Sequence, residues 1–286
     1  MKKGHTCRVV SSAPEAATPE QIARLREELE EQQLDGALAA RLAAQPITAS
    51  LADGIEVVAV RDVARHDAIL TEQIREFQPD RVIVSSEDLS HTLLREAAKT
   101  AVDRLVYLAH TPQWFPFGPA SWNPSEEATT AIKNAAGIIV ISASMGEYVW
   151  QCTGCAAALV HPPLYGEGPW PLLGNFESGY LAMVNPCAAK GLPVFLALAD
   201  LLPSHQFAVL PGWGTNQEDY RELRRRPNIA VLPRVKQIEQ FLSQCKLLLM
   251  PSLWLEGFGL IAMEAMLRGV PVIASDSGGL KEAKAR

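Results

Sequence analysis

Short apolar runs alternate with longer amphipathic stretches along the whole chain. Runs of about four to eight apolar residues rich in β-branched side chains predict strands, and the stretches between them predict helices. In the first half we expect strands at residues 6–11, 55–60, 81–85, 105–110, 137–142 and 157–161. In the second half we expect strands at residues 180–184, 206–210, 229–232, 246–250 and 270–274.

The clearest helix start lies at Thr18, where T-P-E-Q supplies an N-cap threonine, a proline at the first helical position and a glutamine three residues after the cap. Strict alternation of strand and helix predicts α/β domains, because parallel strands need a crossover connection between them. We therefore expect two Rossmann-like, doubly wound parallel sheets that face a cleft. Ligands of such sheets bind beyond the carboxyl ends of the strands.

A stretch rich in proline and glycine, P-P-L-Y-G-E-G-P-W-P-L-L-G-N, follows His161. These residues break both helix and strand patterns, so they predict a domain boundary. We expect an N-terminal domain at residues 1–164, a linker at 165–179 and a second domain at 180–286.

The chain has 286 residues, of which 48% are hydrophobic and 20% charged, as in ordinary globular proteins. Its formal net charge of −6 gives no overall positive field for nucleic acid. The densest basic cluster, Arg224-Arg225-Arg226, fits a solvated helix end, and it leaves a local phosphate or peripheral membrane contact open. No apolar run reaches the ~18 residues of a membrane helix.

The five cysteines are scattered and odd in number, which favours free thiols in a reducing cytoplasm over a disulfide framework. Cys152 and Cys155 form a C-x-x-C without a second ligand pair, so we do not expect a zinc site. The chain has no D-x-D pattern of the kind that would hold a divalent metal beside a substrate. We therefore expect neither a metal nor a resident cofactor.

The strand at 246–250 leads into P-S-L-W-L-E-G-F-G-L-I-A-M-E-A-M-L-R-G-V-P, which predicts a nearly all-apolar helix at residues 258–268. Glu264 lies inside this helix, and a buried carboxylate needs hydrogen-bond donors, which ligand hydroxyls can supply. The start of the helix predicts an anion site, because its free amides and dipole favour phosphate. Gly257 and Gly259 would let a ligand approach this backbone closely.

E-G-F-G-L-I-A-M-E resembles the E-x7-E pattern of family 4 and related retaining glycosyltransferases with the GT-B fold. The resemblance extends through A-M-L-R-G-V-P-V-I-A-S-D-S-G-G-L-K-E and, upstream, through N-I-A-V-L-P-R-V. It implies that Glu256 contacts hydroxyls of the donor sugar and that Glu264 contacts the ribose. It also implies that the sugar and diphosphate are bound by the backbone amides of Gly257, Phe258, Gly259 and Leu260.

N-P-C-A-A-K-G at residues 185–191 resembles the family's G-R-L-x-x-x-K-G, which implies that Lys190 binds the diphosphate. Asn185 stands where the family has an arginine, so one diphosphate cation is missing. P-G-W-G-T resembles the family's glycine-rich turn near the donor, with Gly212 and Gly214, although a purely structural turn is an equal alternative. Arg234 lies in a loop that similar proteins place beside the base.

His110 ends a predicted strand and begins the loop H-T-P-Q-W-F-P-F-G-P-A-S-W-N-P. It resembles the family's histidine near the transferred sugar, and a satisfied structural histidine is the alternative. Trp114, Phe115 and Trp122 of this loop either stack against an acceptor or simply pack the loop.

The resemblance implies metal-independent transfer of a sugar from a nucleotide sugar to an acceptor hydroxyl, with retention and with His110, Lys190 and Glu256 in catalytic roles. Two alternatives stay open: a non-catalytic nucleotide-binding relict, and an epimerase or phosphorylase-type enzyme on the same fold. G-H-T-C-R-V-V-S-S resembles the family's second strand and the chain stops soon after G-G-L-K-E, so we expect a fold that is incomplete at both termini. The sugar, nucleotide, acceptor and oligomeric state are not predicted.

Overall fold

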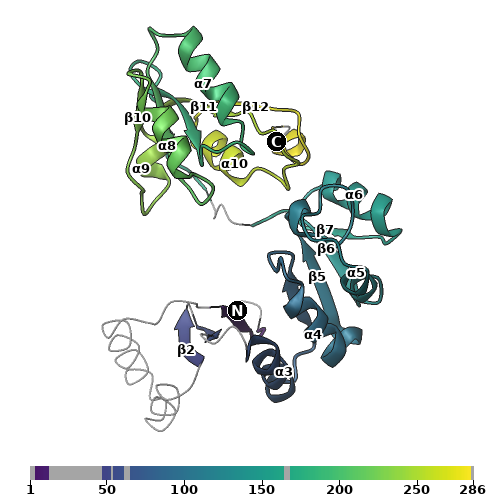
Figure 1. Ribbon diagram of the computed structural model, residues 1–286. Helices are drawn as coiled ribbons and strands as arrows, with labels where there is room; N and C mark the ends of the chain where they lie inside the picture. Colours follow the sequence, from purple (N-terminus) through teal and green to yellow (C-terminus); the bar gives the residue numbers. More distant parts are fainter. Residues whose placement is uncertain (1–3, 13–46, 53, 61–64, 164–167, 285–286) are drawn as a thin grey trace. The chain divides into compact units, whose positions relative to one another are not determined.

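The computed structural model describes residues 4–12, 47–52, 54–60, 65–163 and 168–284 (Figure 1). The chain forms two compact units. The first comprises residues 1–84, 90–107 and 126–137, and the second comprises residues 85–89, 108–125 and 138–286. The helix predicted from Thr18 lies outside the described residues.

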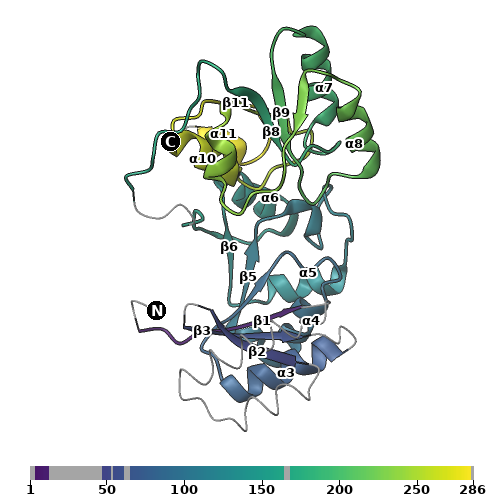
Figure 2. The same ribbon diagram turned by 90° about the vertical axis from the view of Figure 1, so that its left-hand side faces the viewer.

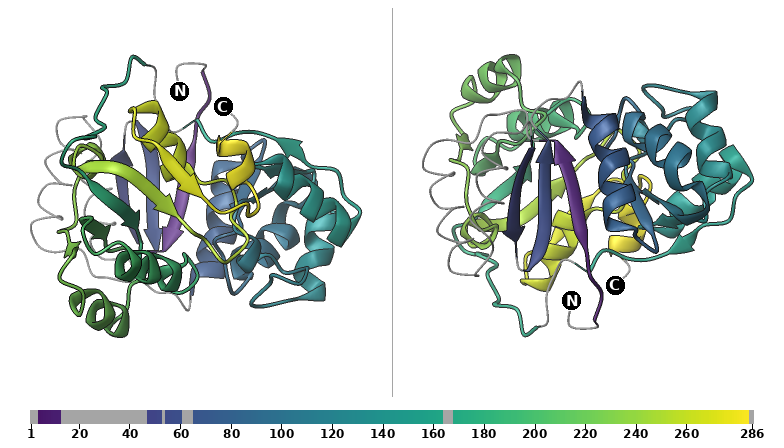
Figure 3. Two further views of the ribbon diagram at one scale, coloured as in Figure 1. Left: turned by 90° about the horizontal axis from the view of Figure 1, so that it is seen from above. Right: turned by 90° about the horizontal axis from the view of Figure 1, so that it is seen from below.

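The first unit contains a small three-stranded sheet with the order β1-β3-β2 (Figures 2 and 3). β1 (Arg8–Ser12) pairs parallel with β3 (Ile55–Val60), whereas β2 (Ile47–Ala52) pairs antiparallel with β3. β1 and β3 confirm predicted strands, and β2 was not predicted. Its sequence, I-T-A-S-L-A, is short and partly polar, but the Asp-Gly that follows at positions 53 and 54 is a hairpin signal that could have revealed it.

Three α-helices of the first unit pack side by side, α3 (His66–Phe77) on α4 (Thr92–Ala101) and α4 on α5 (Glu126–Lys133). A short 3-10 turn, η2 (Val102–Arg104), follows α4. On α3 the buried residues are His66, Ile69, Leu70 and Ile74, which recur at the spacing of one helix face.

A four-stranded sheet has the order β4-β5-β6-β7. Its strands are β4 (Val82–Ser85), β5 (Leu105–Ala109), β6 (Gly137–Val140) and β7 (Ala158–Leu159). All four confirm predicted strands, but β6 ends two residues earlier than predicted. It ends there because Ser142 is the N-cap of α6 (Ala143–Thr153) and its side chain accepts a hydrogen bond from the Met145 amide.

The second unit contains a five-stranded sheet with the order β10-β9-β8-β11-β12, in which every pair is parallel. The strands are β8 (Tyr180–Val184), β9 (Phe207–Leu210), β10 (Ile229–Val231), β11 (Cys245–Met250) and β12 (Val272–Ala274). All five were predicted within two residues at either end. The chain runs outward from β8 through β9 to β10 and then returns to β11, so the winding reverses between β8 and β11.

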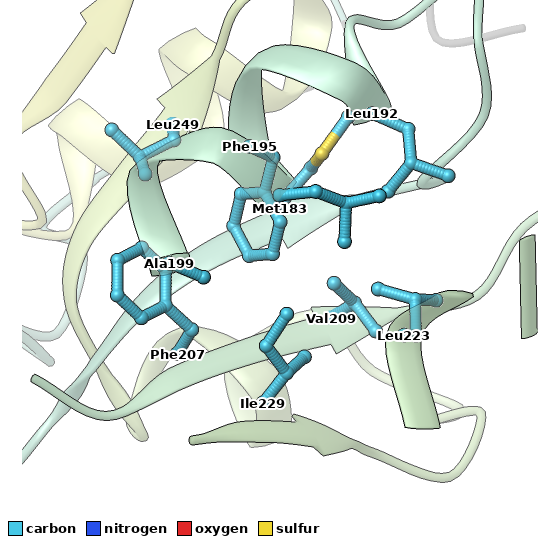
Figure 4. Packing of buried hydrophobic residues seen from close by; sticks show 10 residues of the cluster. Met183, Leu192, Phe195, Ala199, Phe207, Val209, Leu223, Ile229 and Leu249 are labelled. Atoms are coloured by element: carbon cyan, nitrogen blue, oxygen red, sulfur yellow. The ribbon is translucent and has the colours of Figure 1, made fainter. Parts of the chain in front are cut away.

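Helices cover both faces of this sheet, as neighbouring residues of β8 show. Met183 packs with Phe195 of α7 (Leu192–Leu201) and Leu223 of α8 (Gln217–Arg224) in the cluster drawn in Figure 4. Ala182 points to the opposite cluster, which includes residues of α9 (Glu239–Leu242) and α10 (Leu260–Leu267). α11 (Leu280–Lys284) ends the described chain. The sheet is therefore doubly wound, as the sequence predicted.

The basic cluster at Arg224-Arg225-Arg226 lies at the end of α8 and has acidic or aromatic partners within this unit. Arg226 binds Asp200 at 2.7 and 2.8 Å, and Arg225 pairs with Glu222. The Arg226–Asp200 hydrogen bond lowers the pKa of the Asp200 carboxyl. In the described part of the chain, no helix is both long and apolar enough to cross a bilayer.

Candidate functional site

The point where the winding reverses, between β8 and β11, is where a doubly wound sheet offers a ligand-binding crevice. Asn185 comes directly after β8, and Pro251 comes directly after β11. The two loops are joined, because the Leu253 amide donates to the carbonyl of Ala189 at 3.0 Å. The topology thus brings together two of the segments that the sequence singled out.

Lys190 and Glu256 form an ion pair in these loops. The Lys190 Nζ lies 2.7 Å from Oε1 and 2.8 Å from Oε2 of Glu256, and the Ser252 hydroxyl also donates to Oε1. The Glu256 side chain is 8% exposed and that of Lys190 21%. Lys190 Nζ also lies 4.2 Å from the centre of the Trp254 ring. A carboxylate has about four acceptor positions, so one on Oε2 remains for a ligand hydroxyl.

The start of α10 presents a run of unpaired amides. α10 begins at Leu260, two residues later than predicted, because Gly259 adopts a φ of +102° as its N-cap. Within the described residues, the amides of positions 257–261 donate no hydrogen bond. Their partial positive charge adds to the helix dipole, so this tip favours an anion.

Two glycines after β12 hold the loop before α10 in place. A Cβ on Gly278 would lie 2.2 Å from the carbonyl oxygen of Glu256, and a Cβ on Gly279 would lie 2.2 Å from that of Gly257. The Gly279 amide also donates to the Glu256 carbonyl at 2.9 Å. Because any side chain here would separate the two backbones, the Gly-Gly pair fixes the position of Glu256 and the amide tip.

Glu264 lies on α10 and is half-buried. Burial raises the pKa of its carboxyl, while the positive charge of Arg268 lowers it in part. In the portion of the chain that the structure describes, this carboxylate accepts no hydrogen bond. Its predicted contact with ribose hydroxyls stays a prediction, but the carboxylate has the unmet need for donors on which that prediction rests.

Asn185 has a structural task in this site. It is buried, adopts a φ of +55°, and its Oδ1 accepts from the Gly214 amide at 2.9 Å. A Cβ on Gly212 would lie 2.7 Å from the same oxygen. Asn185 therefore fastens the glycine-rich turn to the end of β8. Its Nδ2 is buried and, among the described residues, has no hydrogen-bond partner.

His110 follows β5 and contacts the backbone that carries the amide tip, since a Cβ on Gly257 would lie 2.1 Å from the His110 carbonyl oxygen. Its Nε2 lies 2.8 Å from the Ser85 hydroxyl, and its Nδ1 lies 3.8 Å from a carboxylate oxygen of Glu87. Burial lowers the pKa of the imidazole, and the Glu87 charge raises it in part. The ring is therefore neutral near pH 7 and suited to hydrogen bonding.

Phe258 and Arg234 differ from the other predicted site residues in their surroundings. The Phe258 side chain is buried and packs on the His161 ring at 5.3 Å, so only its backbone amide is available to a ligand. Arg234 lies in an exposed loop after β10 and, among the described residues, makes no hydrogen bond or ion pair. Its predicted contact with a base stays a prediction.

The residues that cap the start of the neighbouring helix, α6, were not predicted from the sequence. Glu282 of α11 accepts from the amides of Ala143 and Ser144 at 2.8 and 2.9 Å. The Ser142 hydroxyl accepts from Met145 and donates to the Gly257 carbonyl at 2.7 Å. The tip of α6 is thus satisfied by the protein itself, whereas the tip of α10 is not. No sequence signal joins residues this far apart.

Comparison with known proteins identifies the segment that carries most of this geometry. Residues 178–285 match the family described as Glycosyl transferases group 1. The match confirms, for these residues, the predicted resemblance to glycosyltransferases. A search of curated proteins finds no match.

The chain is also similar to solved glycosyltransferase structures. HepE from Anabaena, solved with UDP and glucose, is 18% identical with a TM-score of 0.60, over 96% of this chain and 82% of that one. Sucrose-phosphate synthase from Thermosynechococcus elongatus is 15% identical with a TM-score of 0.64, over 96% of this chain and 83% of that one. A glycosyltransferase from Rickettsia africae is 11% identical with a TM-score of 0.58, over 97% and 81%.

These likenesses show the fold, which is the GT-B fold that the sequence predicted. The family match of residues 178–285 supports a glycosyltransferase.

Proposed function

We propose that this protein transfers a sugar from a nucleoside diphosphate sugar to an acceptor hydroxyl, with retention of anomeric configuration and without a metal ion. The observation that carries the proposal is the unpaired amide tip of α10, which begins beside the Lys190–Glu256 pair at the reversal point of the sheet. Such a tip favours the negative charge of a diphosphate. HepE, with UDP and glucose bound, supports a UDP sugar as the donor.

Each predicted residue has a distinct role in this proposal. The amides of 257–260 and the Lys190 ammonium bind the diphosphate, and Glu264 accepts from the ribose hydroxyls. Glu256 uses its free acceptor position for a hydroxyl of the sugar. The turn at Gly212 and Gly214 lies beside the phosphates.

In the transfer step, the bond between the anomeric carbon and the diphosphate oxygen breaks, and the acceptor oxygen bonds to that carbon on the same face. The leaving diphosphate takes the proton of the acceptor hydroxyl, so no protein nucleophile is required. Fixed amides and Lys190 stabilise the negative charge that develops on the leaving group. The neutral His110 donates or accepts a hydrogen bond at the transferred sugar.

We place this reaction in the cytoplasm, because all five cysteines are free thiols. In such a compartment nucleotide sugars and a reduced protein occur together.

Donor binding is tested by thermal shift with UDP, GDP and ADP and their sugars. A nucleotide at about 100 times its Kd should stabilise the fold by about 2.7 kcal/mol. Glu264→Gln should weaken this binding about tenfold or more, because a charged acceptor for ribose hydroxyls is lost. Glu72→Gln, an exposed glutamate on α3, is the matched control and should behave as wild type.

Product analysis then separates transfer from the alternatives. Release of UDP together with a glycosylated acceptor supports the proposal, and an α-linked product from an α-linked donor establishes retention. Nucleotide binding without any transfer or donor hydrolysis would instead favour a non-catalytic binding protein. Activity that survives EDTA supports metal independence, and activity abolished by EDTA and restored by Mg²⁺ refutes it.

A further inference from the structure

Three tryptophan rings from three separate loops contact one another in series in the second unit. Trp254 lies in the middle, with its ring centre 6.2 Å from that of Trp122 and 5.8 Å from that of Trp213. Trp122 belongs to the loop after His110, and Trp213 belongs to the glycine-rich turn. We call these three residues the tryptophan platform.

The two outer members of the platform are open to solvent. Trp122 is 57% exposed and Trp213 is 69% exposed. A single exposed tryptophan is unremarkable, but adjacent exposed aromatic rings indicate a binding surface. Trp150 on α6 is equally exposed, at 59%, and it has no aromatic neighbour in the described part of the chain.

The rings are held in position by specific bonds. The Gln113 side chain donates to the Leu255 carbonyl at 3.1 Å, and the Gln113 carbonyl accepts from the Trp122 amide at 2.8 Å. Gln113 therefore ties the loop of Trp122 to the loop of Trp254. On the other side, the bond between Asn185 and the Gly214 amide fixes the turn that carries Trp213. A preorganised surface of this kind loses little entropy on binding.

The platform adjoins the proposed reaction site. The Lys190 Nζ that binds Glu256 also lies 4.2 Å from the Trp254 ring centre. Because Lys190 lies over a face of the Trp254 ring, a ligand on the exposed rings of Trp122 and Trp213 would lie close to the Lys190–Glu256 pair.

We propose that the tryptophan platform binds the acceptor and that this acceptor is a carbohydrate. A sugar ring has an apolar face of C–H groups that packs on aromatic faces, and its hydroxyls lie at the edge, where they meet polar side chains. The two exposed rings, one on each side of Trp254, offer two stacking positions, which fits an oligosaccharide better than a single sugar. The inference rests on the proposed function, because it names the substrate of that same site.

The test uses Trp122→Ala and Trp213→Ala, with Trp150→Ala as the matched control. Saturation-transfer NMR with a panel of glucose-, galactose-, mannose- and N-acetylglucosamine-based trisaccharides measures binding, and thermal shift with UDP measures the donor site. At least one trisaccharide should receive saturation at its C–H face. Each platform variant should weaken that binding about tenfold, with the Trp150 variant unchanged.

UDP binding should be the same in the Trp122→Ala and Trp150→Ala variants, so that in Trp122→Ala the KM rises for the acceptor and not for the donor. Two results would overturn the inference: no saturation of any trisaccharide by the wild-type chain, or platform variants that lose UDP binding while trisaccharide binding persists, which would assign the rings to the base. A wild-type chain that is not stabilised by any nucleotide would instead refute the proposed function.

Discussion

We expect the two members of the Lys190–Glu256 pair to differ in how much stability is lost when each is replaced. Lys190→Met leaves the Glu256 carboxylate, which is 8% exposed, with the Ser252 hydroxyl as its remaining donor. Stranding a buried charge costs about 3–5 kcal/mol, and the partial exposure of Lys190 reduces this to about 2–3 kcal/mol. Glu256→Gln should cost less, because the longer Lys190 side chain can turn to solvent.

The double variant should recover most of the loss, since neither charge then remains buried. Urea unfolding of the wild type, both single variants and the double variant gives the coupling energy, which we expect to be about 2 kcal/mol. The exposed pair Glu218 and Arg221 on α8 is the control, and its Glu218→Gln and Arg221→Met cycle should give at most about 0.5 kcal/mol. Equal coupling in the two cycles would refute the reasoning.

Three further variants test other parts of the site. Burial raises the pKa of Glu264 in the folded state above its unfolded value. Between these two pKa values the folded state holds a proton that the unfolded state has released, so the stability of the ligand-free protein falls as pH rises through this window. Glu264→Gln should remove this decline in a series of melting curves at different pH, and an unchanged pH profile would contradict the assignment. Ser142→Ala should lower the unfolding free energy by about 1–2 kcal/mol, because the Met145 amide and the Gly257 carbonyl both lose a hydrogen-bond partner. Ser144→Ala is the control and should have little effect, because only the backbone amide of Ser144 makes a hydrogen bond to Glu282. Gly278→Ala should abolish UDP stabilisation in a thermal-shift assay, because its Cβ would meet the Glu256 carbonyl; retained binding would show that the loop can move aside.

The sheets could be predicted from the sequence because buried parallel strands leave a strong local pattern. β8 and β11 are nearly continuous apolar runs, and turns or caps mark their ends. β2 escaped because its polar residues weaken the pattern and its position depends on pairing with β3. The end of β6 was missed for a related reason, since a serine suits either a strand or a helix cap and only the Met145 contact decides.

The parts of the site that lie within one stretch of sequence could be predicted. The contacts that join distant segments could not. The amide tip and the half-buried Glu264 follow from one stretch of sequence, because the spacing along a single helix determines both. The pairing of Lys190 with Glu256 joins residues 66 positions apart, and the bond from Gln113 to Leu255 joins residues 142 apart. Such contacts depend on how loops from different strands meet. The residue pattern within one loop does not show which other loop it contacts.

The carboxylate of Glu282 that caps α6 has a consequence for ligand choice. The protein carries two adjacent helix starts that would both attract phosphate, and it fills one of them with an anion of its own. Of these two starts, the one with amides free to bind a diphosphate is that of α10. The selectivity of the open tip is thus set in part by a residue on another helix that the ligand never touches.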